Sequence, residues 1–222
     1  MSEQSVWDTL RDMGAILKDD HFVYTKGGHG SEYVNKDALF MHPAGFSKLC
    51  SMIADEFRDM FGTPLPDVVL GPAVGGALVA QQVAYHLGAN SRSKPLAIYA
   101  DKEGDGFVLK RGYDEKVPGK KILIVEDILN TGGSVKQVVE LARTHGGDVI
   151  GVGAICNRGD VRIVDIGKPP KLFSVVSTRM VMYDSSQCPL CAEGRPINTK
   201  IGKGKEYVEK HGQPKVPDYE DS

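Results

Sequence analysis

The stretch KKILIVEDILNTGGSVKQVVE, residues 120–140, decides the fold class. Its apolar run from Ile122 to Val125 is typical of a buried strand. Two carboxylates, Glu126 and Asp127, follow directly, and after a glycine-rich loop an apolar periodicity indicates a helix. If the strand is central in a parallel sheet and ends at these carboxylates, they lie in the crevice where α/β proteins bind ligands.

The loop NTGGS, residues 130–134, offers successive backbone N–H groups where glycine permits close approach. The helix that follows directs its positive dipole end toward the same place, which favours an anion such as phosphate. N–H groups that can bind a phosphate, placed beside two carboxylates that can accept bonds from vicinal hydroxyls, suit phosphorylated ribose as the ligand. The sequence has neither GxxxxGK[ST] nor a GxGxxG between a strand and a helix, which argues against a P-loop NTPase or a dinucleotide enzyme.

The segments around this stretch repeat a strand-and-helix alternation. This pattern predicts an α/β protein with a central parallel sheet flanked by helices. The further strands are expected in DVVLGP (67–72), KPLAIYA (94–100) and DVIGVGAIC (148–156), and the further helix in GGALVAQQVAYHLG (75–88).

The two ends of the chain follow other patterns, and we expect one domain in three parts. Residues 1–62 should hold a helix with Val6, Leu10, Met13 and Leu17 on one face, a glycine-centred hairpin over 21–39, and a second helix from Pro43. The core sheet should occupy residues 63–184. Residues 185–222 are polar and rich in Gly, Pro and Lys, which indicates an extended arm with a disordered end.

Composition excludes several classes of protein. The 222 residues are 41% apolar and 25% charged, with a formal net charge of −2, so no global basic field suggests nucleic acid. No apolar run approaches the roughly 20 residues that cross a bilayer. The four cysteines are too few for a disulfide scaffold of this size, and we expect a cytoplasmic protein that binds neither nucleic acid nor membrane.

The stretch ILIVEDILNTGGS resembles the phosphoribosyl pyrophosphate signature of the type I phosphoribosyltransferases. In that family, two acidic residues hold the ribose hydroxyls and the loop holds the 5′-phosphate. The resemblance therefore implies the type I phosphoribosyltransferase fold, with an N-terminal hood and a C-terminal arm. It also implies that phosphoribosyl pyrophosphate is bound by Glu126, Asp127, Asn130, Thr131, Gly132, Gly133 and Ser134.

Other segments are similar to the orotate branch of the family. HFVYTKGGHGSEYVNKDAL keeps the branch's hood spacing of Lys26, Ser31 and Tyr33, and LGPAVGGALVA resembles its pyrophosphate loop. YADKEGDGFVLKRGY, residues 99–113, resembles the mobile catalytic loop that typically closes over a partner subunit, which implies a homodimer. The pyrophosphate-binding residues implied by the resemblance are Gly75, Gly76, Lys102, Lys110 and Arg111.

The resemblance also implies the acceptor and the chemistry. Arg158 in AICNRGD matches the arginine that contacts orotate, and a planar guanidinium can bind a carboxylate through two bonds. Lys26, which also serves phosphoribosyl pyrophosphate, and Asn130 complete the implied orotate site. Lys102 and Asp127 are the expected catalytic residues, and Mg²⁺ is expected to arrive with the substrate. The implied reaction transfers the phosphoribosyl group to orotate in pyrimidine nucleotide synthesis.

Two alternatives stay open at this point. Many orotate enzymes have Thr where Asn130 stands, so the acceptor could be a purine or another base. A protein of this fold could also be a regulatory protein that senses phosphoribosyl pyrophosphate and binds nucleic acid, which predicts a fused helix-turn-helix or a concentrated basic face. Neither is evident beyond a short Lys-rich stretch within residues 200–210.

The segment CPLC places Cys188 and Cys191 at the spacing of a zinc-binding pair. Zinc takes four ligands, and a second cysteine pair of suitable spacing is missing. Cys156, a histidine or a partner chain could supply the rest. We interpret the segment as a packed turn in preference to a zinc site.

Overall fold

The computed structural model describes residues 3–61, 65–89, 91–92 and 94–215. The chain divides into two compact units. The first, the core unit, comprises Met1–Asp8 and His42–Arg179. The second, the terminal unit, comprises Thr9–Met41 and Met180–Ser222. The end of the tail, residues 216–222, for which disorder was predicted, lies outside the described residues.

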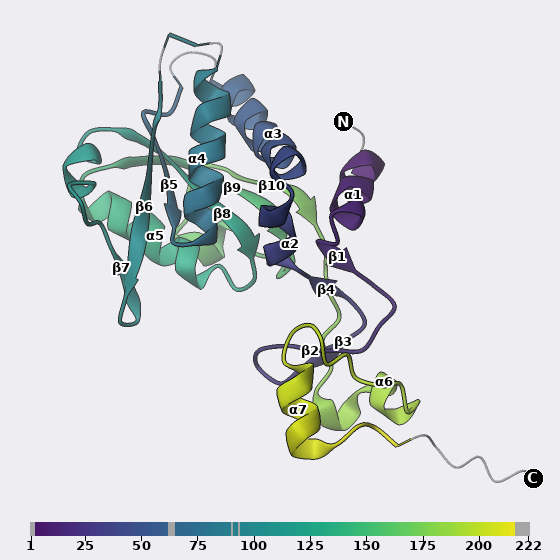
Figure 1. Ribbon diagram of the computed structural model, residues 1–222. Coiled ribbons are helices and arrows are strands. Elements are labelled where there is room, and N and C mark those ends of the chain that lie inside the picture. Colours follow the sequence, from purple (N-terminus) through teal and green to yellow (C-terminus); the bar gives the residue numbers. More distant parts are fainter. Residues whose placement is uncertain (1–2, 62–64, 90, 93, 216–222) are drawn as a thin grey trace, which may run out of the picture. The chain divides into compact units, whose positions relative to one another are not determined.

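The core unit contains a six-stranded sheet in the order β10-β9-β8-β5-β6-β7 (Figure 1). Neighbouring strands are parallel except for β7, which is antiparallel to β6. The predicted central parallel sheet is confirmed, whereas β7 and β10 were not predicted. The strands are β5 (Val68–Pro72), β6 (Leu96–Glu103), β7 (Gly106–Val108), β8 (Lys121–Leu129), β9 (Asp148–Asn157) and β10 (Leu172–Ser177).

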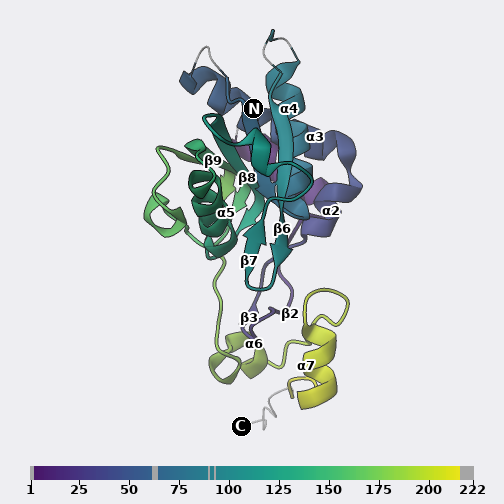
Figure 2. The ribbon, with the colours of Figure 1, turned by 90° about the vertical axis from the view of Figure 1, so that its left-hand side faces the viewer.

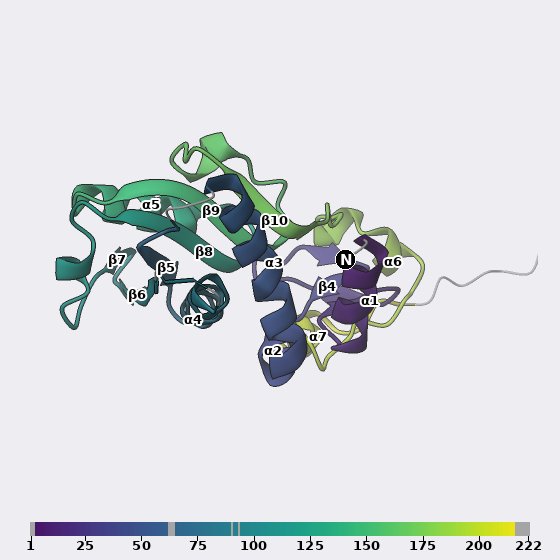
Figure 3. The same ribbon diagram turned by 90° about the horizontal axis from the view of Figure 1, so that it is seen from above.

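Helices cover both faces of this sheet (Figure 3). α5 lies on one face, where Val135 and Val138 join a buried apolar cluster with Ile122 and Ile124 of β8. α3 and α4 lie on the other face. The helices of the core unit are α3 (Pro43–Phe61), α4 (Gly75–Gly88) and α5 (Gly133–Thr144), with the short 3₁₀ helices η1 (Asp114–Lys116) and η2 (Ile163–Ile166).

Glycines of β9 allow α3 to approach the sheet closely. A Cβ on Gly151 would come within 2.4 Å of the Phe57 ring, and one on Gly153 within 2.5 Å of the Ile53 side chain. Both α3 side chains are fully buried. Any larger residue at these strand positions would push the helix away, so the two glycines set the spacing of this layer.

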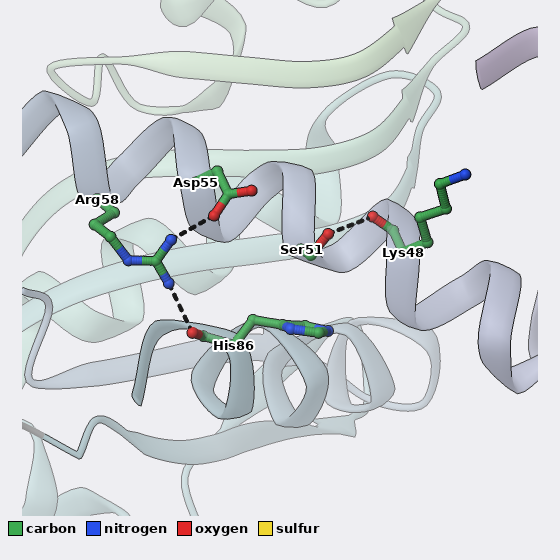
Figure 4. Close-up of polar contacts among 5 residues, drawn as sticks. All are labelled: Lys48, Ser51, Asp55, Arg58 and His86. Carbon is green, nitrogen blue, oxygen red and sulfur yellow. Dashed lines mark hydrogen bonds and ion pairs between the residues drawn. The ribbon is translucent and has the colours of Figure 1, made fainter. Parts of the chain in front are cut away.

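Polar contacts join α3 to the end of α4 (Figure 4). Arg58 donates from its guanidinium to the backbone carbonyl of His86 at 2.7 Å and also pairs with Asp55. Ser51 bonds the Lys48 carbonyl within α3 at 2.8 Å. The Arg58 bond adds a donor to a carbonyl in the last turn of α4, which also accepts the Ala89 N–H at 3.4 Å.

The terminal unit is built from two short strand pairs and small helices. β1 pairs with β4 and β2 pairs with β3, both antiparallel, so the predicted hairpin is confirmed at β2–β3. Its elements are β1 (Ile16–Leu17), β2 (Phe22–Val23), β3 (His29–Gly30), β4 (Tyr33–Val34), α2 (Lys36–Met41), η3 (Ser185–Gln187), α6 (Pro189–Ala192) and α7 (Gly204–His211).

Two predictions for the chain ends were wrong in part. α1 (Glu3–Asp12) ends earlier than predicted, and Leu17 lies on β1 instead of on the helix. The C-terminal segment is not an extended arm, because α6 and α7 fold within the terminal unit (Figure 2). Backbone bonds from Asn198 to His21 at 2.8 Å and from Lys203 to Val23 at 2.8 Å tie it to the N-terminal hairpin. None of the described helices is long and apolar enough to cross a membrane.

Candidate active site

The acidic pair lies within strand β8 and not at its end. β8 continues to Leu129, and the pair is buried, with Glu126 8% and Asp127 6% exposed. This corrects the expectation that the strand ends at the carboxylates. The strand continues because the carboxylates accept backbone N–H groups: Glu126 Oε1 accepts from Asp127 N at 3.0 Å, and Asp127 Oδ1 from Ile128 N at 2.6 Å.

Side-chain alternation directs the two carboxylates to opposite faces of the sheet. Ile122 and Ile124 face α5, so Glu126 lies on that face and Asp127 on the face of α4. Contact with α4 is direct, because a Cβ built on Gly75 would lie 2.0 Å from Asp127 Oδ2. The same Oδ2 atom is buried and has no hydrogen-bond partner among the described residues. A buried carboxylate oxygen without a partner is costly unless a ligand or cation satisfies it.

The predicted phosphate loop connects β8 to α5. Gly132 is the residue before the helix and has φ +77°, and a Cβ there would meet Ile166 at 2.7 Å and Val161 at 2.9 Å. Glycine is therefore required both by conformation and by packing. Thr131, Gly133 and Ser134 are exposed, and the first N–H groups of the 12-residue helix α5 have no intrahelical acceptors.

The second predicted loop connects β5 to α4, and close packing explains its glycines. A Cβ on Gly71 would lie 2.2 Å from the Gly76 carbonyl oxygen, and one on Gly76 would lie 3.0 Å from the Val125 carbonyl oxygen. The Ala73–Val74 peptide bond in this loop is cis. With Gly75 against Asp127, the start of α4 is packed directly on the end of β8.

Asn130 and Arg158, predicted to contact the base, lie side by side. Arg158 Nε donates to Asn130 Oδ1 at 3.4 Å, and the Arg158 backbone N–H bonds the Leu129 carbonyl at 3.0 Å. A Cβ on Gly159 would lie 1.5 Å from the Asn130 carbonyl oxygen, so the chain after β9 passes directly over the end of β8. The structure thus brings the two residues together at the carboxyl ends of neighbouring strands.

The segment predicted as the catalytic loop contains a β-hairpin. β6 and β7 pair with Lys102 opposite Phe107, and a two-residue turn at Gly104 and Asp105 joins them (Figure 2). Lys102 is exposed and has no hydrogen-bond or ion-pair partner among the residues that the structure describes.

The other two cations of this segment have acidic partners within it. Lys110 pairs with Glu103 at 2.5 Å. Arg111 pairs with Asp101 and lies over the Tyr99 ring at 5.4 Å, and the Asp101 bond raises the pKa of the guanidinium. These pairs were not predicted, because they depend on the register of the hairpin. Of these three cations, Lys102 is therefore the one without such a partner among the described residues.

The remaining predicted residues belong to the terminal unit. Lys26 is exposed in the turn between β2 and β3, so its role beside Asn130 and Arg158 stays a prediction. Cys188 immediately precedes α6 and Cys191 lies in it, and neither forms a disulfide.

The parallel sheet, the acidic pair within β8 and the two glycine loops agree with the resemblance to the phosphoribosyltransferases. A family model described as "Phosphoribosyl transferase domain" matches residues 35–181. The chain belongs to this family.

Curated relatives refine the comparison. A protein of Caldanaerobacter subterraneus subsp. tengcongensis is 37% identical over 197 residues, covering 89% of this chain and 96% of that protein. One of Thermotoga maritima is 34% identical over 197 residues, covering 89% and 97%. Both are named orotate phosphoribosyltransferase.

Solved structures show the fold. Orotate phosphoribosyltransferase from Aeropyrum pernix superposes with a TM-score of 0.59 at 24% identity, covering 77% of this chain and 92% of that one. Adenine phosphoribosyltransferase from Saccharomyces cerevisiae superposes with a TM-score of 0.58 at 18% identity, covering 77% and 99%. The type I phosphoribosyltransferase fold predicted from the sequence is confirmed. Enzymes named for different bases share it, so the fold alone does not select the base.

Proposed function

We propose that this protein transfers the 5-phosphoribosyl group of phosphoribosyl pyrophosphate to orotate, giving orotidine 5′-phosphate and pyrophosphate. Relatives that carry the name orotate phosphoribosyltransferase are 33–37% identical over 88–89% of the chain. The structural observation that carries the proposal is the unpartnered Asp127 carboxylate oxygen, held between β8 and the first residue of α4.

In this reaction the protein has to position the two substrates and to compensate the charges that develop in the transition state. A ring nitrogen of orotate attacks C1 of the ribose while the bond from C1 to the pyrophosphate oxygen breaks. Positive charge grows on the sugar ring, and negative charge grows on the leaving pyrophosphate. No protein nucleophile is needed, so rate enhancement comes from alignment of the two substrates and from preorganised charges.

The sugar phosphate is assigned to β8 and the loop behind it. Glu126 and Asp127 accept hydrogen bonds from the ribose hydroxyls, and the N–H groups of residues 131–134 bind the 5′-phosphate. Support comes from the order of these groups along one rigid strand and helix. The left-handed Gly132 turns the chain so that the start of α5 follows directly on the strand.

The leaving pyrophosphate is assigned to the α4 start and the β6–β7 hairpin. Gly75 and Gly76 offer backbone N–H groups at the start of a 14-residue helix, which favours an anion. Lys102 supplies a positive charge, and it has no ion pair among the described residues that must break before it can bind pyrophosphate. Lys110 and Arg111 would have to leave Glu103 and Asp101 first, so Lys102 carries the main catalytic role.

Mg²⁺ is part of the proposal as a companion of phosphoribosyl pyrophosphate. Asp127 Oδ2 is a hard oxygen donor without a hydrogen-bond partner among the described residues, which fits a magnesium ion or one of its waters. When bound, the ion would neutralise charge on the pyrophosphate. Asp127 would then serve both the ribose and the ion.

The base is assigned to Arg158, Asn130 and Lys26. The Arg158 guanidinium offers two parallel donors to the orotate carboxylate, and Asn130 orients it through the 3.4 Å contact. Lys26 would add a second positive charge, which suits an anionic base better than a neutral purine. We further propose a cytoplasmic homodimer in which the β6–β7 hairpin serves the partner's site, and light scattering of the purified protein checks the dimer.

A base screen tests the proposed function. The protein is incubated with phosphoribosyl pyrophosphate, Mg²⁺ and one base at a time, and pyrophosphate release is followed. We expect turnover with orotate and little with adenine, guanine or hypoxanthine. Turnover with a purine and none with orotate would contradict the proposal and identify the protein as a purine phosphoribosyltransferase. Tight binding of phosphoribosyl pyrophosphate without turnover on any base would favour the sensing role.

A further inference from the structure

Four metal-binding side chains of the terminal unit converge on one point. They are His21, just before β2, His29, the first residue of β3, Cys188, just before α6, and Cys191 within α6. One ligand atom from each lies within 4.8 Å of all the others. Both histidines and Cys188 are buried, and Cys191 is partly buried. We propose that these residues bind one structural Zn²⁺, a site separate from the phosphoribosyl transfer chemistry.

The distances between the ligand atoms fit a tetrahedral zinc ion. With Zn–S of about 2.3 Å and Zn–N of about 2.05 Å, a tetrahedron separates sulfur from nitrogen by about 3.6 Å and the two nitrogens by about 3.3 Å. Cys188 Sγ and Cys191 Sγ lie 3.7 and 3.8 Å from His21 Nε2, and Cys191 Sγ lies 3.4 Å from His29 Nδ1. The nitrogens of the two histidines are 2.9 Å apart, a few tenths of an ångström short.

Hydrogen bonding fixes His21 in the form that binds metal. Its Nδ1 lies 2.8 Å from the Arg195 backbone carbonyl, which can only accept, so Nδ1 carries the hydrogen. In the neutral ring, Nε2 then has a free lone pair, and this is the atom that faces the two sulfurs. A backbone carbonyl that orients a histidine in this way is the usual outer partner of a zinc ligand.

A plain hydrogen-bonded histidine pair is the alternative to a metal site. In such a pair His29 Nδ1 would donate to His21 Nε2 across the 2.9 Å contact. The other ring nitrogen of His29, Nε2, is buried without a hydrogen-bond partner among the described residues, and this holds for the histidine pair and for the metal site alike. The pair would also leave two thiols packed on imidazoles with no strong bond. A metal ion uses all four groups at once.

The donor set selects the ion and its role. Two thiolates and two imidazoles suit Zn²⁺, whereas Mg²⁺ and Ca²⁺ prefer oxygen ligands, and the cluster contains no carboxylate. Two thiolates also balance the charge of the ion, so the buried site is neutral. Because four protein ligands complete the tetrahedron and leave no open position, the site is structural.

The ion would join the two ends of the chain. Cys188 and Cys191 follow each other by one helical turn, which places both sulfurs on one side of α6. The histidines stand on the β2–β3 hairpin, more than 150 residues earlier. A small unit made of two-residue strands gains much from such a crosslink. On the proposed function the ion would also steady the turn that carries Lys26, but the site itself does not depend on that function.

Metal content and cobalt spectroscopy of the wild-type chain, without a histidine tag, test the site. Elemental analysis should give one zinc per chain after purification from zinc-supplemented medium. Reduced apoprotein titrated with Co²⁺ should develop the visible bands of a tetrahedral ion and a thiolate-to-cobalt charge-transfer band, saturating at one equivalent. Zinc below one tenth per chain together with no cobalt spectrum would overturn the proposal.

Variants locate the bound ion. Replacing Cys188 and Cys191 together by Ser should remove the zinc, whereas Cys191→His should retain it and lose part of the charge-transfer intensity. Two matched controls, His211→Ala in the same unit and Cys50→Ala in α3, should each keep one zinc. Full zinc content in the double serine variant would place the ion elsewhere and refute the assignment. If that variant fails to fold, release of one zinc per chain on thiol modification of the wild type decides the matter.

Discussion

Replacing Gly75 by Ala should disable the site through Asp127. A Cβ at this position would lie 2.0 Å from Asp127 Oδ2 and 2.6 Å from Cγ, whereas real Cβ atoms essentially never approach another atom within 3.0 Å. The carboxylate or the helix start must therefore move by at least the 1.0 Å between these values. The carboxylate cannot rotate freely, because it is buried and Oδ1 holds the Ile128 N–H at 2.6 Å.

The expected loss follows from the size of this displacement. Misplacing a binding group by 1 Å can cost about 100-fold in rate, which corresponds to about 2.7 kcal/mol of transition-state stabilisation. We therefore expect kcat/KM for phosphoribosyl pyrophosphate to fall about 100-fold. If the Ile128 bond is also lost, the free energy of unfolding should fall by about 0.5–1.5 kcal/mol, which leaves the chain folded.

Initial rates of pyrophosphate release with orotate measure this effect, and a thermal melt followed by circular dichroism verifies folding. Gly88→Ala at the other end of α4 is the matched control, because its Cβ would meet nothing closer than Lys94 Cδ at 3.4 Å, an ordinary contact. It should keep wild-type kcat/KM. In an Asp127→Ala background the effect of Gly75→Ala should shrink, since the clashing oxygen is gone. A folded Gly75→Ala variant with wild-type kcat/KM would refute the reasoning.

Three further predictions concern Lys102, Arg158 and the two buried thiols of the core unit. Lys102→Ala should lower kcat by about 10²–10³-fold with an unchanged melting temperature. Lys120→Ala, at an exposed lysine before β8, should turn over normally, and equal kcat values for the two variants would contradict the assignment. Arg158→Lys should raise KM for orotate far more than KM for phosphoribosyl pyrophosphate, because an ammonium group cannot replace the planar fork of the guanidinium. Steady-state kinetics with each substrate varied in turn measure both values, and a larger rise in KM for phosphoribosyl pyrophosphate would contradict the assignment. Burial raises the pKa of Cys50 and Cys156 to about 12, so at pH 8 only about one thiol in 10⁴ of each is ionised. Neither should react with a thiol reagent until the chain is unfolded, and rapid labelling of either in the native protein would disprove this.

Local signals in the sequence were enough to find the strand, the acidic pair and the glycine loop that follows them. Apolar residues over 122–125, two carboxylates and a Thr-Gly-Gly turn are contiguous, so no knowledge of the tertiary fold was needed. The strand end was misplaced because a carboxylate is usually solvated at a strand terminus. Here Glu126 and Asp127 satisfy backbone N–H groups of the next residue and stay in the sheet, which composition cannot reveal.

The β6–β7 hairpin shows what depends on register. Glycines and charges over residues 99–113 suggested a loop, and only the family resemblance singled out Lys102 among its three cations. Pairing of Asp101 with Val108 and of Glu103 with Gly106 instead folds the segment back. This brings Glu103 to Lys110 and Asp101 to Arg111, and sets Lys102 apart from both. Which cation is available to a ligand is therefore a property of the hairpin and not of the residue types.

The histidines of the proposed zinc site were missed for a similar reason. Only the cysteine pair has a local spacing, whereas His21 and His29 come together because Val23 pairs with His29 across the β2–β3 hairpin. That register puts residue 21 diagonal to residue 29 on the same face of the hairpin. Inserting one residue into the 24–28 turn would shift the register by one and turn His29 to the opposite face. Such a chain would keep all four ligand residues and lose the site, so the length of this turn is as much a part of the metal site as the ligands are.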